Sequence, residues 1–361
     1  MKTKDGVAEN SSVPAVPTYV RGMTIRTWND PGWNVAFVPA DFRKTVVFIG
    51  QDIAGEMYVC GSAFWVINVP SSEEAAKKYR PAYLVTAAHV IERLRSQGVR
   101  TFRIRVNLKG GDAQWLDGMS IDRWKEHPDP TVDASFLKLA IYEEWDHTGW
   151  PTDAFITAES LKQENTEIEL GDEVFSVGLF WPHKGKTRNV PIVRIGNVAA
   201  FRDEKVETKR GTLSDLYLME ARSLGGLSGS PVYMDVLRSI TGKEGVTLLY
   251  PVKGTRFRLL GLISGHYTGI DDERLASGIS ENDLAKLNMG IADVTPADKL
   301  LEGLHQFKVE EEEESKQYRE RGPLTVEVGD TTRQTNVTSN LAKFGYSDAI
   351  GEGWPTKKRN K

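Results

Sequence analysis

Short apolar runs separated by turn-forming residues fill the middle of the chain and restrict its fold more than any other feature. Between residue 41 and about residue 305 these runs are enriched in Val, Ile, Phe and Tyr, and Gly, Asp, Asn and Pro split them. Their length and regular spacing are typical of strands in a β-barrel or sandwich. The clearest runs are Thr45–Gly50, Met57–Val69, Tyr83–Ala87, Thr101–Leu108, Ala134–Ile141, Glu173–Leu179, Val190–Ala200, Ser214–Glu220, Val246–Val252 and Arg258–Ser264. We therefore predict an all-β fold.

Helical patterns are few. Ser72–Tyr79 predicts one short capped helix between strands. At Thr295–Asp298 an N-cap threonine, a proline at the first helical position and an acid in the first turn follow one another. The next apolar side chains form one stripe, made of Leu300, Leu301, Leu304 and Phe307. The sequence therefore predicts a C-terminal helix that ends near residue 308.

Charge and cysteine content exclude several classes of protein. Lys and Arg total 46 against 50 Asp and Glu, a net charge of −4, so the chain has no basic footprint for nucleic acid. No run approaches the roughly 18 apolar residues of a membrane helix, and Met1–Pro17 has no secretory signal pattern. Cys60 is the only cysteine, which excludes an internal disulfide and a multi-cysteine metal site. We expect a soluble, cytoplasmic protein without a cofactor.

The segment Gly226–Val232 combines the residue types that a nucleophilic serine requires. Such a serine needs an exposed hydroxyl and nearby N–H groups directed at a developing oxyanion. Glycines on both sides of Ser228 permit a tight turn, and the N–H groups of Gly226 and Ser228 are candidate oxyanion donors. Taken alone, the segment is also explained as a simple turn.

A histidine and an aspartate upstream supply the other groups for this chemistry. The apolar run at Tyr83–Ala87 leads into His89, whose imidazole suits proton transfer near neutral pH. Asp133 opens the next alternating strand, where its carboxylate can orient an imidazole. Asp122 and Asp129 are competing carboxylates in poorer contexts. Singly, His89 is also explained as a core histidine and Asp133 as a turn residue.

Together, in the order His89, Asp133, Ser228, these motifs resemble those of the trypsin-like (chymotrypsin-fold) serine peptidase family. Thr86–His89 is similar to the family's histidine motif, Asp133–Ala134 to its aspartate motif and Gly226–Pro231 to its serine motif. Further segments extend the resemblance over about residues 44–306: Cys60–Val66, Gly171–Gly178, Leu260–Gly265 and Asn288–Ile291. The lack of disulfides, and Leu227 where secreted members carry an acid, favour bacterial HtrA-like or glutamyl-endopeptidase-like relatives.

This resemblance implies two six-stranded antiparallel β-barrels with short helices and a C-terminal helix, and a site between the barrels. The implied division is an irregular N-terminal arm at 1–40, a first barrel at 41–150, a second barrel with the helix at 151–308, and a charged tail at 309–361. In the implied endopeptidase mechanism Ser228 is the nucleophile, His89 the general base and Asp133 its orienting partner, without a metal.

Substrate and regulation leave alternatives open. Arg222 and His266, with Ser264 and Gly265, would line the substrate pocket and favour an acidic residue at the cleavage site, although surface charge also explains the two basic side chains. The alternative function is a catalytically latent scaffold. A third possibility is a peptidase activated by a protein partner through the arm or the tail, and ester hydrolysis is a fourth. An α/β-hydrolase is disfavoured because its serine precedes its histidine. We expect protein or peptide substrates and no nucleic-acid or membrane partner.

Overall fold

The computed structural model describes residues 38–53, 56–67, 82–163, 168–208, 210–221, 227–241, 247–251, 256–268 and 288–321. Most of the predicted arm, the predicted helix at Ser72–Tyr79 and the end of the predicted tail lie outside these residues.

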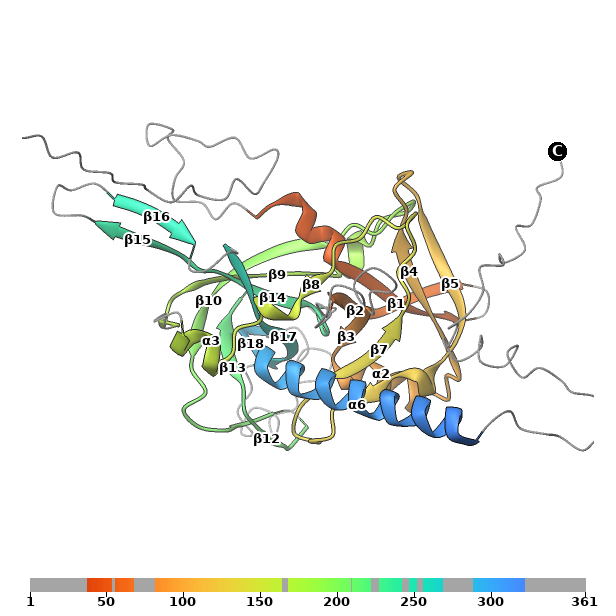
Figure 1. Cartoon of the computed structure of the whole chain (residues 1–361). Coiled ribbons are helices and arrows are strands. Elements are labelled where there is room, and N and C mark those ends of the chain that lie inside the picture. The colour runs from red at the N-terminus through yellow and green to blue at the C-terminus, as the bar shows by residue number, and fades with distance from the viewer. Residues whose placement is uncertain are drawn as a thin grey trace, which may run out of the picture. The chain divides into compact units, whose positions relative to one another are not determined.

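The N-terminal half is an eight-stranded sheet that curls on itself (Figure 1). Its strand order is β5-β4-β1-β2-β3-β7-β6, and β8 pairs in parallel with β2. The strands are β1 (Val46–Ile53), β2 (Glu56–Ile67), β3 (Ala82–Thr86), β4 (Thr101–Asn107), β5 (Ala113–Ser120), β6 (Lys125–Glu126), β7 (Ser135–Leu139) and β8 (Trp150–Pro151).

The C-terminal half is a closed barrel of six strands in the order β10-β13-β18-β17-β14-β9. These are β9 (Glu173–Gly178), β10 (Ile192–Ala200), β13 (Tyr217–Glu220), β14 (Pro231–Asp235), β17 (Phe257–Thr268) and β18 (Asn288–Pro296). Two hairpins extend it: β11 (Val206–Glu207) with β12 (Leu213–Ser214), and β15 (Leu237–Thr241) with β16 (Thr247–Pro251).

The predicted fold class is confirmed, and nearly every apolar run becomes a strand within a few residues of its expected bounds. The sheets of the two halves differ in closure. The second sheet is a closed barrel, whereas the strand pairing of the first sheet ends at β5 on one side and at β6 on the other. β5 was not predicted from sequence, since its side chains are mostly exposed or half-exposed and it lacks a continuous apolar run.

Alternation along the barrel strands divides the core in two. Val174 and Val232 point into the closed barrel, while their neighbours Phe175 and Tyr233 point to the other side and join the apolar core of the first sheet. The larger of the two apolar cores therefore belongs to both halves, and the smaller one fills the closed barrel.

An aromatic cluster (Phe42, Trp150, Phe175, Tyr233 and Phe257) lies where the halves meet. Phe42, on the short 3₁₀ helix η1 (Ala40–Thr45), is at its centre. Its ring centroid lies 4.8 to 5.3 Å from those of the other four rings. The Tyr233 hydroxyl donates to Thr45 Oγ1 at 3.1 Å, which satisfies the polar end of a fully buried tyrosine.

A polar cluster (Arg105, Asn107 and Asn189) forms a second contact between the halves. The Asn189 N–H donates to Asn107 Oδ1 at 2.7 Å, and Asn189 Nδ2 donates to the Arg105 carbonyl at 2.6 Å. The Arg105 guanidinium donates to the carbonyls of Gly185 and Lys186 at 2.9 and 2.7 Å. Burial lowers the pKa of Arg105. The segment before β10 is thus tied to β4 by buried hydrogen bonds.

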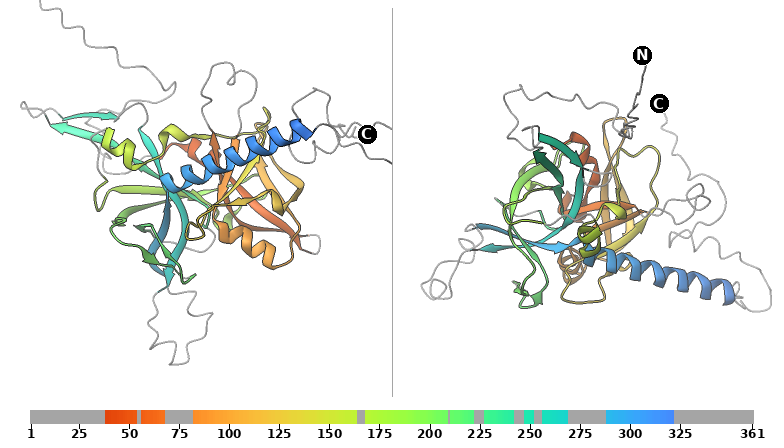
Figure 2. Two further views of the ribbon diagram at one scale, coloured as in Figure 1. Left: turned by 60° about the horizontal axis from the view of Figure 1, so that its bottom comes forward. Right: turned by 60° about the vertical axis from the view of Figure 1, so that its left-hand side comes forward.

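Helix α6 (Ala297–Arg321) begins directly after β18 and runs along the first sheet (Figure 2). Leu300, Leu304 and Phe307 are buried against that sheet, as their predicted stripe requires, and the Phe307 ring lies 5.8 Å from that of Tyr83. The helix continues past residue 308 through the acidic run, because glutamate and lysine favour helix and the first breakers are Gly322 and Pro323. Among the described helices none is both long and apolar enough to cross a bilayer.

Candidate active site

His89 lies in the first turn of helix α2 (Ala88–Ser96), which follows strand β3. The sequence did not predict this helix, because the apolar run of β3 continues into its first residues. Ala87, at the N-cap, has no side chain that can accept a hydrogen bond. The free N–H groups at the helix start therefore need an acceptor from elsewhere.

Asp133 supplies that acceptor and also contacts the imidazole. Its Oδ1 accepts the His89 N–H at 2.9 Å, and its Oδ2 lies 2.7 Å from His89 Nδ1. Side-chain exposure is 21 % for His89 and 12 % for Asp133, so the pair is largely shielded from water. A carboxylate held at two points fixes both the position of the helix start and the orientation of the ring.

The competing carboxylates are used locally. Asp129 accepts the N–H and the hydroxyl of Thr131 at 2.9 and 2.8 Å, and these hydrogen bonds lower its pKa. Asp122 Oδ2 accepts the Ser120 hydroxyl at 3.4 Å, in the 3₁₀ turn after β5. Asp133 precedes β7 by two residues rather than opening it, and of these three candidates it alone contacts His89.

Ser228 lies in a tight turn before β14. The Ser230 N–H donates to the Leu227 carbonyl at 2.8 Å, and Gly229 adopts a φ of 81°, which favours glycine. A Cβ at Gly229 would also overlap the Ser62 carbonyl oxygen and the Thr86 hydroxyl. The glycine after Ser228 is therefore required both by its backbone conformation and by the close approach of the first sheet.

Ser62, on β2, connects this turn to the histidine strand. Its N–H donates to the Ser228 carbonyl at 3.2 Å, its hydroxyl accepts the Leu179 N–H at 2.9 Å, and its carbonyl accepts the Thr86 hydroxyl at 2.7 Å. Thr86 ends β3, just before the helix that carries His89. Sequence analysis noted the segment around Ser62 but assigned it no role, since its partners are distant in sequence.

The structure thus brings the Ser228 turn, His89 and Asp133 to one junction of the two halves. Within the described part of the chain, the Ser228 hydroxyl makes no hydrogen bond to the His89 imidazole, and the Ser228 N–H has no acceptor. Gly226 and Arg222 lie outside the described residues.

The other predicted pocket residues lie on β17. Ser264 Oγ donates to the Asp293 carbonyl at 3.4 Å, and His266 pairs with Ala292. Gly265 pairs with Asp293, whose carboxylate lies where a side chain at Gly265 would be. Asp293 is only 3 % exposed. Sequence analysis missed this carboxylate because it sits in an apolar strand with no motif around it.

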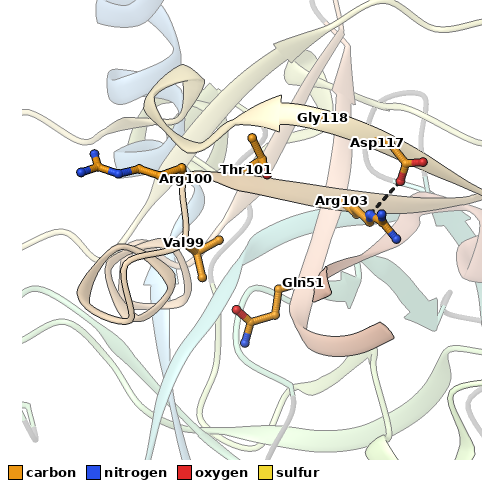
Figure 3. Close-up of a pocket in the computed structure, with 7 residues that line it drawn as sticks. All are labelled: Gln51, Val99, Arg100, Thr101, Arg103, Asp117 and Gly118. Carbon is orange, nitrogen blue, oxygen red and sulfur yellow. Dashed lines mark ion pairs between the residues drawn. The ribbon is translucent and has the colours of Figure 1, made fainter. Parts of the chain in front are cut away.

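No group of three His, Cys, Asp or Glu side chains in the described ranges could hold a metal ion. One pocket, of about 490 Å³, opens at the far end of α2 from His89 (Figure 3). None of its lining residues is a predicted site residue; they are Gln51, Val99, Arg100, Thr101, Arg103, Asp117 and Gly118.

Comparisons with known proteins give structural neighbours only. No family model matches the chain. No curated protein matches it either. The MamO protease domain from Magnetospirillum magneticum shows 14 % identity and a TM-score of 0.36, covering 67 % of this chain and 98 % of its own. Deg5 shows 17 % identity and a TM-score of 0.34, covering 53 % and 75 %.

The HtrA-type protease AlgW, solved with a decapeptide, shows 15 % identity and a TM-score of 0.37, covering 72 % of this chain and 62 % of its own. The likeness to these three structures is loose.

Proposed function

We propose that this protein is a trypsin-like serine endopeptidase whose catalytic groups are Ser228, His89 and Asp133. The observation that carries the proposal is the contact between Asp133 and His89 beside the glycine-flanked turn of Ser228. Asp133 Oδ1 accepts the His89 N–H at 2.9 Å, and Asp133 Oδ2 lies 2.7 Å from His89 Nδ1. A carboxylate that fixes the ring at Nδ1 leaves Nε2 for proton transfer, which is the arrangement that general-base catalysis requires.

In this mechanism Ser228 Oγ attacks the carbonyl carbon of a peptide bond while its proton passes to His89 Nε2. The C–N bond of the tetrahedral intermediate then breaks as His89 returns the proton to the leaving amine. Water hydrolyses the resulting ester in the same two steps. The N–H groups of Ser228 and Gly226 would stabilise the oxyanion, each contributing roughly 3–4 kcal/mol. The Ser228 N–H has no other acceptor in the described part of the chain, which supports this role.

The first test replaces the nucleophile. Ser228→Ala should lower peptide turnover by about 10⁶-fold, because the three groups act as a unit. Ser176→Ala is the matched control: it removes a buried barrel hydroxyl that has no hydrogen-bond partner among the described residues, and it should leave turnover unchanged. Equal turnover in the Ser228→Ala variant and the wild type would reject the proposal.

The second test asks whether the site is assembled. Hydrogen bonds between a nucleophile and its base often tighten only when substrate binds, so the unformed Ser228–His89 hydrogen bond is compatible with activity. Prompt labelling of Ser228 by a fluorophosphonate probe is the expected result. Labelling only in the presence of cell extract would indicate activation by a partner, and labelling under no condition would indicate a latent scaffold.

Cleavage specificity can be decided with a peptide library. Arg222 and His266 favour an acidic residue at the cleavage site, whereas the buried Asp293 carboxylate beside Gly265 favours a basic one. We propose the acidic preference. A cleavage profile dominated by Lys or Arg would reject it and assign the specificity to Asp293.

A further inference from the structure

The hairpin formed by β11 and β12 carries an arginine at its tip. The Thr208 N–H donates to the Thr212 carbonyl at 2.9 Å, and the Gly211 N–H donates to the Thr208 carbonyl at 2.9 Å. Gly211 has a φ of 70°, so the chain turns back immediately after Arg210. This local geometry presents the Arg210 side chain at the end of the hairpin.

The Arg210 side chain, which belongs to the barrel half, contacts residues of the first half at the candidate active site. Its Nη1 lies 3.3 Å from Asp133 Oδ1, and its Nη2 donates to both carboxylate oxygens of Glu92 at 2.7 and 2.8 Å. Glu92 is on α2, three residues after His89, and therefore on the same face of that helix. A second contact holds the hairpin in place, because Ser214 Oγ donates to the Thr131 carbonyl at 2.7 Å, two residues before Asp133.

We propose that Arg210 is a positioning residue for the Asp133 carboxylate, and that Glu92 offsets its charge so that the imidazolium can still form. This inference rests on the proposed peptidase function. Asp133 Oδ1 is held by the His89 N–H on one side and by the guanidinium on the other, which leaves Oδ2 directed at the ring. The hairpin of one half thereby fixes the carboxylate of the other half.

The need for Glu92 follows from the charges. A cation beside Asp133 opposes the positive charge that His89 acquires during the reaction, which weakens the stabilisation that the carboxylate provides. Glu92, paired with the same guanidinium, cancels this effect, so the ring still experiences one net negative charge. Two further cations belong to these elements: Arg93 of α2 acts to lower the pKa of Cys60, and Lys205, before β11, acts to lower that of Asp215.

The test uses two single variants with opposite electrostatic consequences. In Glu92→Gln the guanidinium is no longer offset, so the acid limb of the kcat/KM profile should move to lower pH and kcat should fall by about three- to tenfold. In Arg210→Gln the opposing cation is gone, so the acid limb should move to higher pH. The double variant restores the net charge and should return the limb close to its wild-type position.

Arg103→Gln is the matched control, because Arg103 also forms a half-exposed ion pair, with Asp117 at 2.8 Å, at the pocket of Figure 3. It should leave the profile unchanged. A merely structural role for Arg210 would lower the stability of both single variants without moving their profiles in opposite directions. Shifts in the same direction, or none, would overturn the proposal.

NMR titration of the His89 imidazole in the same variants separates this inference from the proposed function, because it needs no turnover. Opposite shifts of its titration midpoint in Glu92→Gln and Arg210→Gln are expected. If these shifts occur while the wild type neither hydrolyses peptides nor labels with the probe, the coupling is supported and the peptidase function is rejected. If the wild type is active and the midpoints do not move, the coupling alone is rejected.

Discussion

The two halves of the molecule meet at two contacts of different kinds. The aromatic cluster around Phe42 is an apolar contact of five rings, whereas the polar cluster joins Asn107 and Asn189 by buried hydrogen bonds. The aromatic cluster gains free energy from area removed from water, and this gain depends little on angle. The polar cluster gains little net free energy, but its hydrogen bonds are satisfied in one arrangement only. The first contact therefore holds the halves together, and the second sets how they are placed.

Placement matters because the candidate site is divided between the halves. His89 and Asp133 belong to the first half and Ser228 to the second, and the N–H of Ser62 donates to the Ser228 carbonyl across the junction at 3.2 Å. A small rotation of one half would separate the hydroxyl from the imidazole while leaving each sheet intact. Two changes test this difference between the two clusters, and a third tests a separate contact beside the loop that carries Asp133.

The largest effect is expected from Phe42→Ala. Removing the central ring leaves a cavity between the halves and should lower the free energy of unfolding by about 3–5 kcal/mol. Urea denaturation followed by tryptophan fluorescence measures this loss. Leu170→Ala, at an apolar residue that is 61 % exposed, should change stability by less than about 0.5 kcal/mol. A loss of similar size in both variants would show that the aromatic cluster is not what holds the halves together.

An intermediate effect is expected from Asn107→Ala, which leaves the buried Asn189 N–H without its acceptor. Stability should fall by about 1–3 kcal/mol. Asn189→Ala keeps this N–H and instead removes the hydrogen bond from Asn189 Nδ2 to the Arg105 carbonyl. A double-mutant cycle of the two variants therefore measures the coupling between these two hydrogen bonds, which should be at least about 0.5 kcal/mol. Peptide turnover should fall more, relative to the stability lost, than it does in Phe42→Ala. Additive stabilities would contradict the cluster as one network.

The smallest effect concerns the contact between α6 and the loop that carries Asp133. His127 is buried beside Gly303 of α6, its Nδ1 accepts the Asp129 N–H at 3.0 Å, and burial lowers its pKa from 6.5. Glu302 and Asp129 act in the opposite direction, and Lys299 adds to the lowering. The unfolded chain therefore binds a proton at a higher pH than the folded one. The stability that the neutral ring provides is complete above 6.5 and is lost as the pH falls toward the folded value.

His127→Asn keeps an acceptor near the Nδ1 position and removes the titration. The wild type should therefore lose more stability than this variant between about pH 7.5 and about pH 5.5, in urea midpoints measured side by side. Equal losses in the two proteins would assign the acid sensitivity of the fold to other groups.

The sequence predicted those features that depend on neighbouring residues. Alternating apolar runs located most strands, and glycine-flanked Ser228 located the turn, since a φ of 81° at Gly229 is a local requirement. The motifs also selected His89 and Asp133, which the structure brings within 2.7 Å of each other. Helix α2, by contrast, has no side-chain cap of its own, and its first turn is capped by Asp133, which accepts the His89 N–H. No local sequence pattern therefore predicts this helix.

Local sequence patterns could not predict the side chains that make contacts between the two halves. Arg210 is an ordinary turn arginine in sequence and Glu92 an ordinary helix glutamate, and Ser62 is one small residue in a strand. Their contacts join residues that the chain separates by many strands. Only the packing of one half on the other gives them partners.

The sequence by itself determined that this chain forms β-sheets with a glycine-flanked serine turn, because hydrophobic alternation and glycine conformations are properties of adjacent residues. The tertiary structure decided how the Asp133 carboxylate is held at the start of α2, and which arginine meets that carboxylate. Asp122, Asp129 and Asp133 carry the same chemical group, and the fold gives each carboxylate a different hydrogen-bond partner.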